Sequence, residues 1–182
     1  EIFSGVTRYA RMYLARDKQF AGRLLVPAML ISLAIPVAPA RAERMLEPLR
    51  FFEGRTELFS MVKVMMKKPY KSQTLGRGQI LPDGSLSLVQ QVQEQGKPTS
   101  NRRWLIREVS PGRFTGTMSD AVGPVQIQQI GGKFLFKFRM KGKLGVEQWI
   151  MPLPGGKSAK RKVTVKKLGM RVATSEGTIR KL

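Results

Sequence analysis

Hydrophobic and polar side chains alternate along most of the chain from about residue 55 onward. The pattern is clearest at residues 133–141. One face of this segment carries Phe134, Phe136, Phe138 and Met140, and the other carries Lys137, Arg139 and Lys141. Successive side chains of a β-strand point to opposite faces, so a period of two predicts half-buried strands and does not fit a helix.

Weaker versions of the same alternation occur elsewhere, separated by turn signals. Residues 102–109 place Trp104 and Ile106 on one face. Further alternating pairs or triplets are Leu86, Leu88 and Val92; Val125 and Ile127; and Val163 and Val165. Between them stand Pro82-Asp83-Gly84, Ser110-Pro111-Gly112, Gly131-Gly132 and Pro154-Gly155-Gly156. Such dipeptides supply the positive φ angles of hairpin turns, so the chain is predicted to be an all-β antiparallel meander or barrel of about 8–10 strands.

One short helix is expected before the strands. Leu46, Leu49 and Phe52 recur at helical spacing within residues 45–52. We expect this helix to pack across one end of the barrel.

The N-terminal segment has the composition of a secretory signal. Residues 24–40 contain no charge, basic residues precede them, and Ala40-Arg41-Ala42 has the small side chains of a cleavage site. The pattern predicts an N-terminal extension and signal-peptide helix over residues 1–42, cleaved after Ala42, and a barrel domain over residues 43–182. A buried helix or an uncleaved anchor fits less well because the segment holds three prolines and is short for a membrane span. The protein is therefore expected to be periplasmic or secreted.

The composition of the chain limits the catalytic and metal-binding chemistry that it can carry out. The chain of 182 residues has 33 Lys and Arg against 12 Asp and Glu, a net charge of +21, and neither Cys nor His. Thiol and imidazole chemistry and the usual zinc sites are thereby excluded, and we expect no enzyme activity, catalytic residue, metal or cofactor. A basic surplus suggests nucleic acid or an anionic surface, but export and the absence of a nucleic-acid-binding motif argue against nucleic acid.

Several short motifs of the sequence resemble those of a known protein family. They are Phe51-Phe52-Glu53-Gly54, Trp104 followed by Pro111-Gly112-Arg113-Phe114-Thr115-Gly116, Val122-Gly123, Trp149-Ile150-Met151, and Lys167-Leu168-Gly169-Met170-Arg171-Val172. In this order they resemble an uncharacterised proteobacterial domain-of-unknown-function family described as lipocalin-like (calycin) barrels. The resemblance covers residues 46–179. It implies a lipocalin-like β-barrel and no settled activity.

A barrel of this size encloses either packed side chains or one small ligand. The residues expected on a ligand-binding wall are Phe134, Phe136, Phe138, Met140, Trp104, Trp149, Leu86 and Leu88. Each residue alone is more typical of an ordinary core than of a ligand site, whereas three Phe and a Met along one strand favour an adaptable apolar ligand site.

Two basic clusters are candidates for binding an anionic surface. The first is Lys67, Lys68, Tyr70 and Lys71, and the second is Lys157, Lys160, Arg161 and Lys162. Point charges of this kind capture acidic head groups, although the same residues also serve as a solvated surface.

Two functions remain open on these grounds. The first is an exported binding protein that holds a small hydrophobic or amphipathic, lipid-like ligand in its barrel and uses a basic surface to meet anionic lipid or lipopolysaccharide. The second is an envelope structural or interaction protein with a packed barrel, a basic face and no cavity ligand. An enzyme that relies on carboxylates alone is a third and weaker alternative, because the Asp and Glu residues are scattered.

Overall fold

In the computed structural model, the described residues 48–182 form a closed barrel of ten antiparallel strands, preceded by one turn of helix, α1 (Pro48–Phe51). The all-β barrel prediction is confirmed, at the upper end of the expected strand number. The signal-peptide prediction, its cleavage site and the start of the expected helix lie outside the described residues. Within residues 48–182, no helix has the length and apolar character that crossing a membrane would require.

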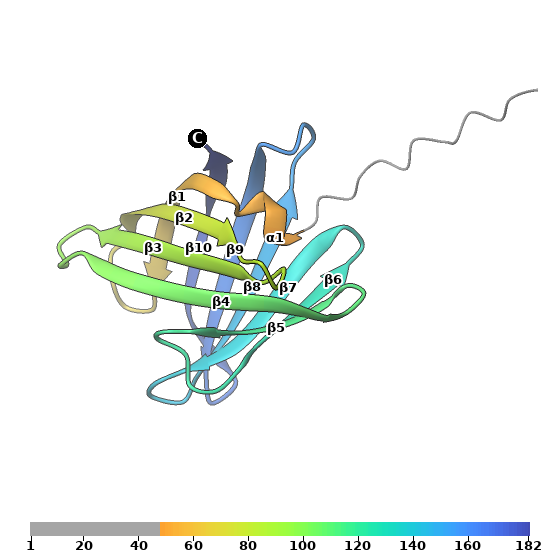
Figure 1. Ribbon diagram of the computed structural model, residues 1–182. Helices are drawn as coiled ribbons and strands as arrows, with labels where there is room; N and C mark the ends of the chain where they lie inside the picture. Colours follow the sequence, from red (N-terminus) through yellow and green to blue (C-terminus); the bar gives the residue numbers. More distant parts are fainter. Residues whose placement is uncertain (1–47) are drawn as a thin grey trace, which may run out of the picture. The chain divides into compact units, whose positions relative to one another are not determined.

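The strands follow one another around the barrel in chain order (Figure 1). They are β1 (Gly54–Val64), β2 (Tyr70–Ile80), β3 (Leu86–Glu94), β4 (Ser100–Ser110), β5 (Arg113–Met118), β6 (Val125–Ile130), β7 (Lys133–Met140), β8 (Leu144–Pro152), β9 (Ser158–Lys167) and β10 (Met170–Lys181). The last strand pairs with the first, with Leu58 opposite Ile179, so the sheet has no free edge.

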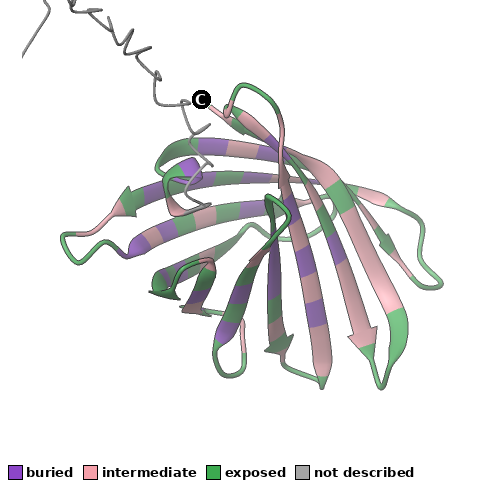
Figure 2. Ribbon diagram, turned by 90° about the vertical axis from the view of Figure 1, so that its right-hand side faces the viewer, coloured by how far each residue is buried: buried purple, intermediate pink, exposed green. Residues whose placement is uncertain are grey.

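Burial alternates along the strands as the sequence pattern predicts. Figure 2 shows the resulting bands of buried and exposed residues crossing the barrel wall. In β7, Phe134 and Phe136 are buried, Phe138 and Met140 are partly buried, and the intervening Lys137 and Arg139 are exposed. The alternating faces are therefore the inside and the outside of the barrel.

One end of the barrel is closed by the segment around α1. Phe51 and Phe52 are buried there and meet edge to face, with ring centroids 5.1 Å apart. The backbone fits so closely that a Cβ added at Gly78 would lie 1.9 Å from the carbonyl oxygen of Phe52. Figure 1 places α1 at the end of the barrel where the C-terminus lies. We call this the closed end.

The turns divide between the two ends of the barrel. The turns β2–β3, β4–β5, β6–β7 and β8–β9 belong to the closed end, because each antiparallel connection reverses the chain. The turns β1–β2, β3–β4, β5–β6, β7–β8 and β9–β10 belong to the opposite end, which we call the mouth end.

Candidate functional site

The barrel contains a cavity of about 480 Å³ that reaches from the closed end to the mouth end. Phe52, Ile106 and Ile150 line its depth, and Tyr70 and Lys97 belong to its lining at the mouth end. This volume lies in the range of roughly 300–1,000 Å³ typical of small-molecule sites.

An aromatic cluster forms one wall of the cavity. Trp104 on β4 meets Phe136 and Phe138 of β7 edge to face, with centroid distances of 6.3 and 5.8 Å. The Trp104 indole Nε1 donates to Oε1 of Gln90 on β3 at 2.8 Å, which fixes the ring plane. These contacts give the cavity a rigid apolar wall with its one polar atom satisfied.

Arg161 brings a positive charge into this apolar interior. It lies on β9 with its side chain in the cavity lining, and its Nε donates to Oε1 of Gln148 on β8 at 2.9 Å. No carboxylate of the described residues pairs with its guanidinium. The side chain is partly accessible, because its open surface faces the cavity.

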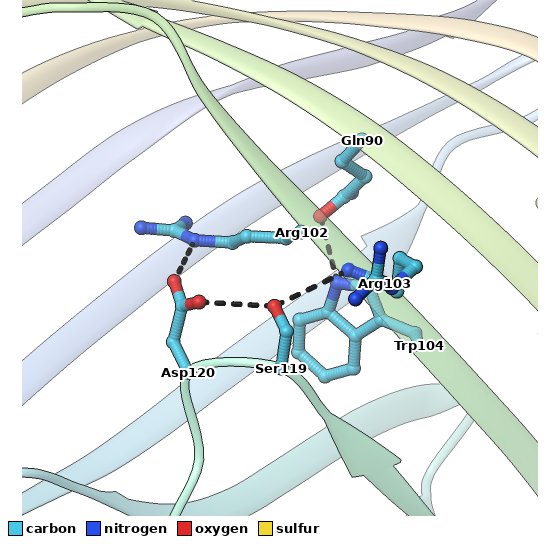
Figure 3. A network of polar contacts seen from close by, with 6 residues as sticks. All are labelled: Gln90, Arg102, Arg103, Trp104, Ser119 and Asp120. Carbon is cyan, nitrogen blue, oxygen red and sulfur yellow. Dashed lines mark hydrogen bonds and ion pairs between the residues drawn. The ribbon is translucent and has the colours of Figure 1, made fainter.

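A second arginine lies in the cavity lining and comes from the opposite wall. Arg102 lies on β4, five strands from β9 around the barrel. Its Nε donates to Oδ2 of Asp120, in the β5–β6 turn, at 2.8 Å. Asp120 in turn accepts from the Ser119 hydroxyl at 2.9 Å, and Figure 3 shows how this network holds the Arg102 side chain away from Trp104.

The two arginines influence each other electrostatically. Burial, and to a smaller extent the like charge of Arg102, lowers the pKa of Arg161 to about 10. Arg161 thus stays protonated at neutral pH but carries an uncompensated desolvation cost. A group that bears such a cost inside a cavity has the properties of an anion-binding site.

The wall formed by β1, β2 and β10 differs in chemistry from the aromatic wall. It contributes hydroxyl groups to the cavity lining: Thr56, Ser60, Ser72, Thr74 and Ser175. The same strands also contribute aliphatic side chains, such as Leu58, Val62 and Ile179. The cavity therefore has an aromatic wall, a wall that mixes hydroxyl groups with aliphatic side chains, and two guanidinium groups.

Tyr70, Glu94 and Lys97 contribute a polar group to the cavity lining at the mouth end. The Lys97 ammonium forms an ion pair with Glu94, donates to the Tyr70 hydroxyl at 3.1 Å and lies 4.8 Å from the centre of its ring. Its contacts with Glu94 and Tyr70 raise the pKa of Lys97 above its ordinary value.

The structure brings together most of the predicted apolar wall. Leu88, Trp104, Phe136, Phe138 and Met140 line the cavity. Leu86 and Phe134 are buried inside the barrel but belong to the packed core and not to the cavity lining. Trp149 was placed wrongly: it alternates with the inward Gln148 and Ile150 of β8, so its side chain faces outward and lies opposite Leu135. The ligand-binding role of the lining residues stays a prediction.

The two predicted basic clusters do not form one surface. Lys67, Lys68 and Lys71 are exposed at the mouth end. Lys157 stands at the closed end, and Lys160 and Lys162 lie on the outer face of β9, where Lys162 forms an ion pair with Glu176 at 3.1 Å. Two members belong elsewhere: Arg161 lines the cavity because it alternates with those lysines, and Tyr70 contributes to the lining near the mouth.

Sequence reasoning missed the polar residues inside the barrel, although the signal was present. Arg102 is two positions from Trp104, and Arg161 is two positions from Val163. Each arginine therefore shares the inward face that its apolar neighbour defines. The pairings with Gln148 and Asp120 join distant segments and could not be obtained from a local pattern.

Comparison with known proteins shows the fold. No protein-family model and no curated protein sequence matches the chain. A solved structure of the S-type phycobiliprotein lyase CPES from Guillardia theta is similar with a TM-score of 0.60 and 9% identity, over 74% of this chain and 90% of that one. A protein of unknown function from the DUF3598 family of Nostoc punctiforme is similar with a TM-score of 0.51 and 14% identity, over 74% of this chain. The matched region spans only 49% of the DUF3598 protein.

These likenesses support an uncharacterised barrel domain and correct one prediction. They lend no support to a proteobacterial origin for the resemblance stated above. The prediction that the chain is not an enzyme is overturned, because a barrel of the same fold occurs in a protein named as a lyase. A barrel of this fold is therefore not a sound argument against enzyme activity.

Proposed function

We propose that this protein binds a small amphipathic molecule with an anionic group, such as a fatty-acid-like carboxylate, inside its barrel. The Arg161 guanidinium, a cation inside the barrel with no carboxylate partner in the described residues, is the observation that carries the proposal. Charge-assisted bidentate hydrogen bonds between guanidinium and carboxylate are among the strongest in proteins. A bound carboxylate would replace the hydration that Arg161 lost on folding.

The rest of the cavity supports an elongated ligand. The wall of Trp104, Phe136 and Phe138 offers apolar contact for a chain or ring system, at about 0.8 kcal/mol for each methylene buried. Arg102 adds a second positive charge, partly neutralised by Asp120. The 480 Å³ cavity also favours this function over the alternative of a packed barrel without a ligand.

The proposal includes export and an anionic partner outside the barrel. The signal-like residues 1–42 support delivery to the periplasm or to the outside of the cell. The large basic surplus supports attraction to anionic lipid or lipopolysaccharide.

A titration with paired ligands tests the cavity proposal. The probes are a dansyl-labelled medium-chain fatty acid and its methyl ester, which differ in charge and share the apolar part. Wild-type protein should bind the acid more tightly than the ester. Arg161→Met should weaken binding of the acid by roughly ten- to a hundredfold, the equivalent of one charge-assisted hydrogen bond.

A matched control variant distinguishes anion binding in the cavity from the effect of the protein's overall positive charge. Lys160→Met removes one positive charge from the adjacent, outward position of β9. It should leave the affinity for the acid within about twofold, because exposed charges are screened by salt. Equal losses for Arg161→Met and Lys160→Met, or an Arg161→Met variant that keeps the preference for the acid, would refute an anion site at Arg161.

A further inference from the structure

The mouth end of the barrel carries large exposed apolar side chains at the tips of its turns. Met66 in the β1–β2 turn is 99% exposed and Leu168 in the β9–β10 turn is 79% exposed. Met65 and Met170 beside them are 56% and 64% exposed. These two turns are neighbours, since β1 pairs with β10 and the Met65 amide donates to the Val172 carbonyl at 2.9 Å. The four exposed apolar side chains therefore lie on two adjacent turns, and we treat them as one apolar group.

The backbone at these two tips adopts a conformation that is unusual for large side chains. Met66 and Leu168 have φ angles of 62° and 50°, in the left-handed region that bulky residues rarely adopt. At the closed end, the turns place glycine at their positive φ angles, as at Gly84 (79°). The turns of the mouth end also contain glycines with positive φ, such as Gly142 and Gly169, and Lys143 has a φ angle of 59°. Met66 and Leu168 are thus two of the three described non-glycine residues with positive φ, at positions where glycine would be easier to accommodate.

Positive charges surround this apolar group without compensation. They lie on three consecutive turns of the mouth end and are Lys67, Lys68, Lys141, Lys143, Lys167 and Arg171. Residues 64–71, 140–144 and 166–171 contain no Asp or Glu. None of the six cations forms an ion pair with another described residue. We call the four apolar residues and these six cations the rim cluster.

We propose that the rim cluster docks the mouth of the barrel onto a lipid bilayer that contains anionic lipids. Met66 and Leu168 would enter the boundary between head groups and acyl chains, and the surrounding cations would contact the phosphates. Proteins that bind membranes at their surface combine apolar insertion with attraction to anionic lipid in this way. The inference deepens the proposed attraction to anionic surfaces by naming the face and its orientation, and it does not depend on the cavity ligand.

The orientation has a consequence for ligand exchange. The cavity lining reaches the mouth end through Val64, Tyr70 and Val172, next to the rim cluster. A docked barrel would open toward the lipid phase, so an amphipathic molecule could pass between membrane and cavity without crossing bulk water.

A single labelled cysteine tests the docking face in the full chain. Because the chain contains no Cys, Met66→Cys gives one site for an environment-sensitive dye. Ile130→Cys provides the matched control, since Ile130 is also exposed (47%) but lies next to the β6–β7 turn of the closed end. With vesicles of phosphatidylcholine and phosphatidylglycerol, the dye at position 66 should shift to the blue, and the dye at position 130 should not.

Two further measurements make the test specific. Vesicles of phosphatidylcholine alone, or high salt, should abolish the shift at position 66 because the cations are exposed. Adding Leu168→Gly to the Met66→Cys reporter should raise the anionic lipid needed for half the shift by about tenfold, the loss of one well-buried apolar side chain. Glycine suits the φ angle of position 168, so this variant should fold at least as well as its parent.

The outcomes separate this inference from the cavity proposal. No shift at position 66, equal shifts at positions 66 and 130, or no effect of Leu168→Gly would overturn rim docking. None of these results bears on the preference of Arg161 for the acid over the ester. A failed ligand titration, in turn, would leave a positive vesicle result intact.

Discussion

Replacing Arg161 by methionine should stabilise the ligand-free protein. The lowering of the Arg161 pKa from its ordinary value to about 10 corresponds to a cost on the order of 3 kcal/mol for keeping Arg161 charged in the folded state. Methionine has a similar length and no charge to desolvate, so the variant escapes this cost. The gain is reduced because Gln148, which is 7% exposed, loses the donor to its Oε1, at about 1–2 kcal/mol. The net expectation is a rise of roughly 1–2 kcal/mol in the free energy of unfolding.

The pH dependence of this difference follows from linkage. Below pH 10, Arg161 is protonated in both states and its full cost is present. Between pH 10 and the ordinary pKa of arginine, the unfolded chain binds a proton that the folded protein has released, so the stability of the wild type rises with pH. The advantage of Arg161→Met should therefore be constant at neutral pH and shrink as pH rises through this window.

Urea denaturation followed by tryptophan fluorescence measures the effect at neutral pH in ligand-free protein. The double variant Arg161→Met/Gln148→Leu should gain more than the single variant, because it also removes the unpaired amide. Lys160→Met serves as the control and should change stability by less than about 0.5 kcal/mol. An Arg161→Met variant less stable than the wild type by 1 kcal/mol or more would show that Arg161 is a structural group, and the argument for an anion site would fail.

Two further predictions concern the closed end and the second arginine. Gly78→Ala should destabilise the protein by about 3 kcal/mol or more in urea denaturation, because its Cβ would lie 1.9 Å from the Phe52 carbonyl oxygen. Gly145→Ala, whose Cβ would meet no atom within 4 Å, should be nearly neutral, and similar effects at both positions would contradict the close fit of α1. Asp120→Asn should strengthen binding of the dansyl fatty acid severalfold in the titration, since the carboxylate no longer neutralises Arg102; a weaker affinity for the acid would show that Asp120 is needed to position that arginine.

Local patterns predicted the architecture well. The alternation through Phe134, Phe136 and Phe138 identified β7, and the dipeptides Asp83-Gly84 and Gly131-Gly132 identified hairpin turns. Both signals depend only on neighbouring residues and on the strand period. They suffice for an antiparallel meander, in which every strand pairs with the next one in the chain.

The residues of the site were predicted less well from the same local patterns. Trp149 was assigned to the interior because of its residue type, but its position beside Gln148 and Ile150 turns it outward. Arg161 was assigned to the surface for the same reason, but its position two residues before the buried Val163 turns it inward. In both cases, the alternation of inward and outward positions along the strand predicts the side chain's direction correctly, and the residue type does not.

The sequence by itself determined the strand period, the turns, the basic surplus and the absence of Cys and His, because these are properties of neighbouring residues and of composition. Only the tertiary structure decided what the barrel contains. Closure of β1 against β10 brings Arg102 and Arg161 into one cavity from opposite walls, and the same closure joins the turns that carry Met66 and Leu168. Long-range pairing of distant segments makes both features, and no local pattern encodes which distant residues will face each other.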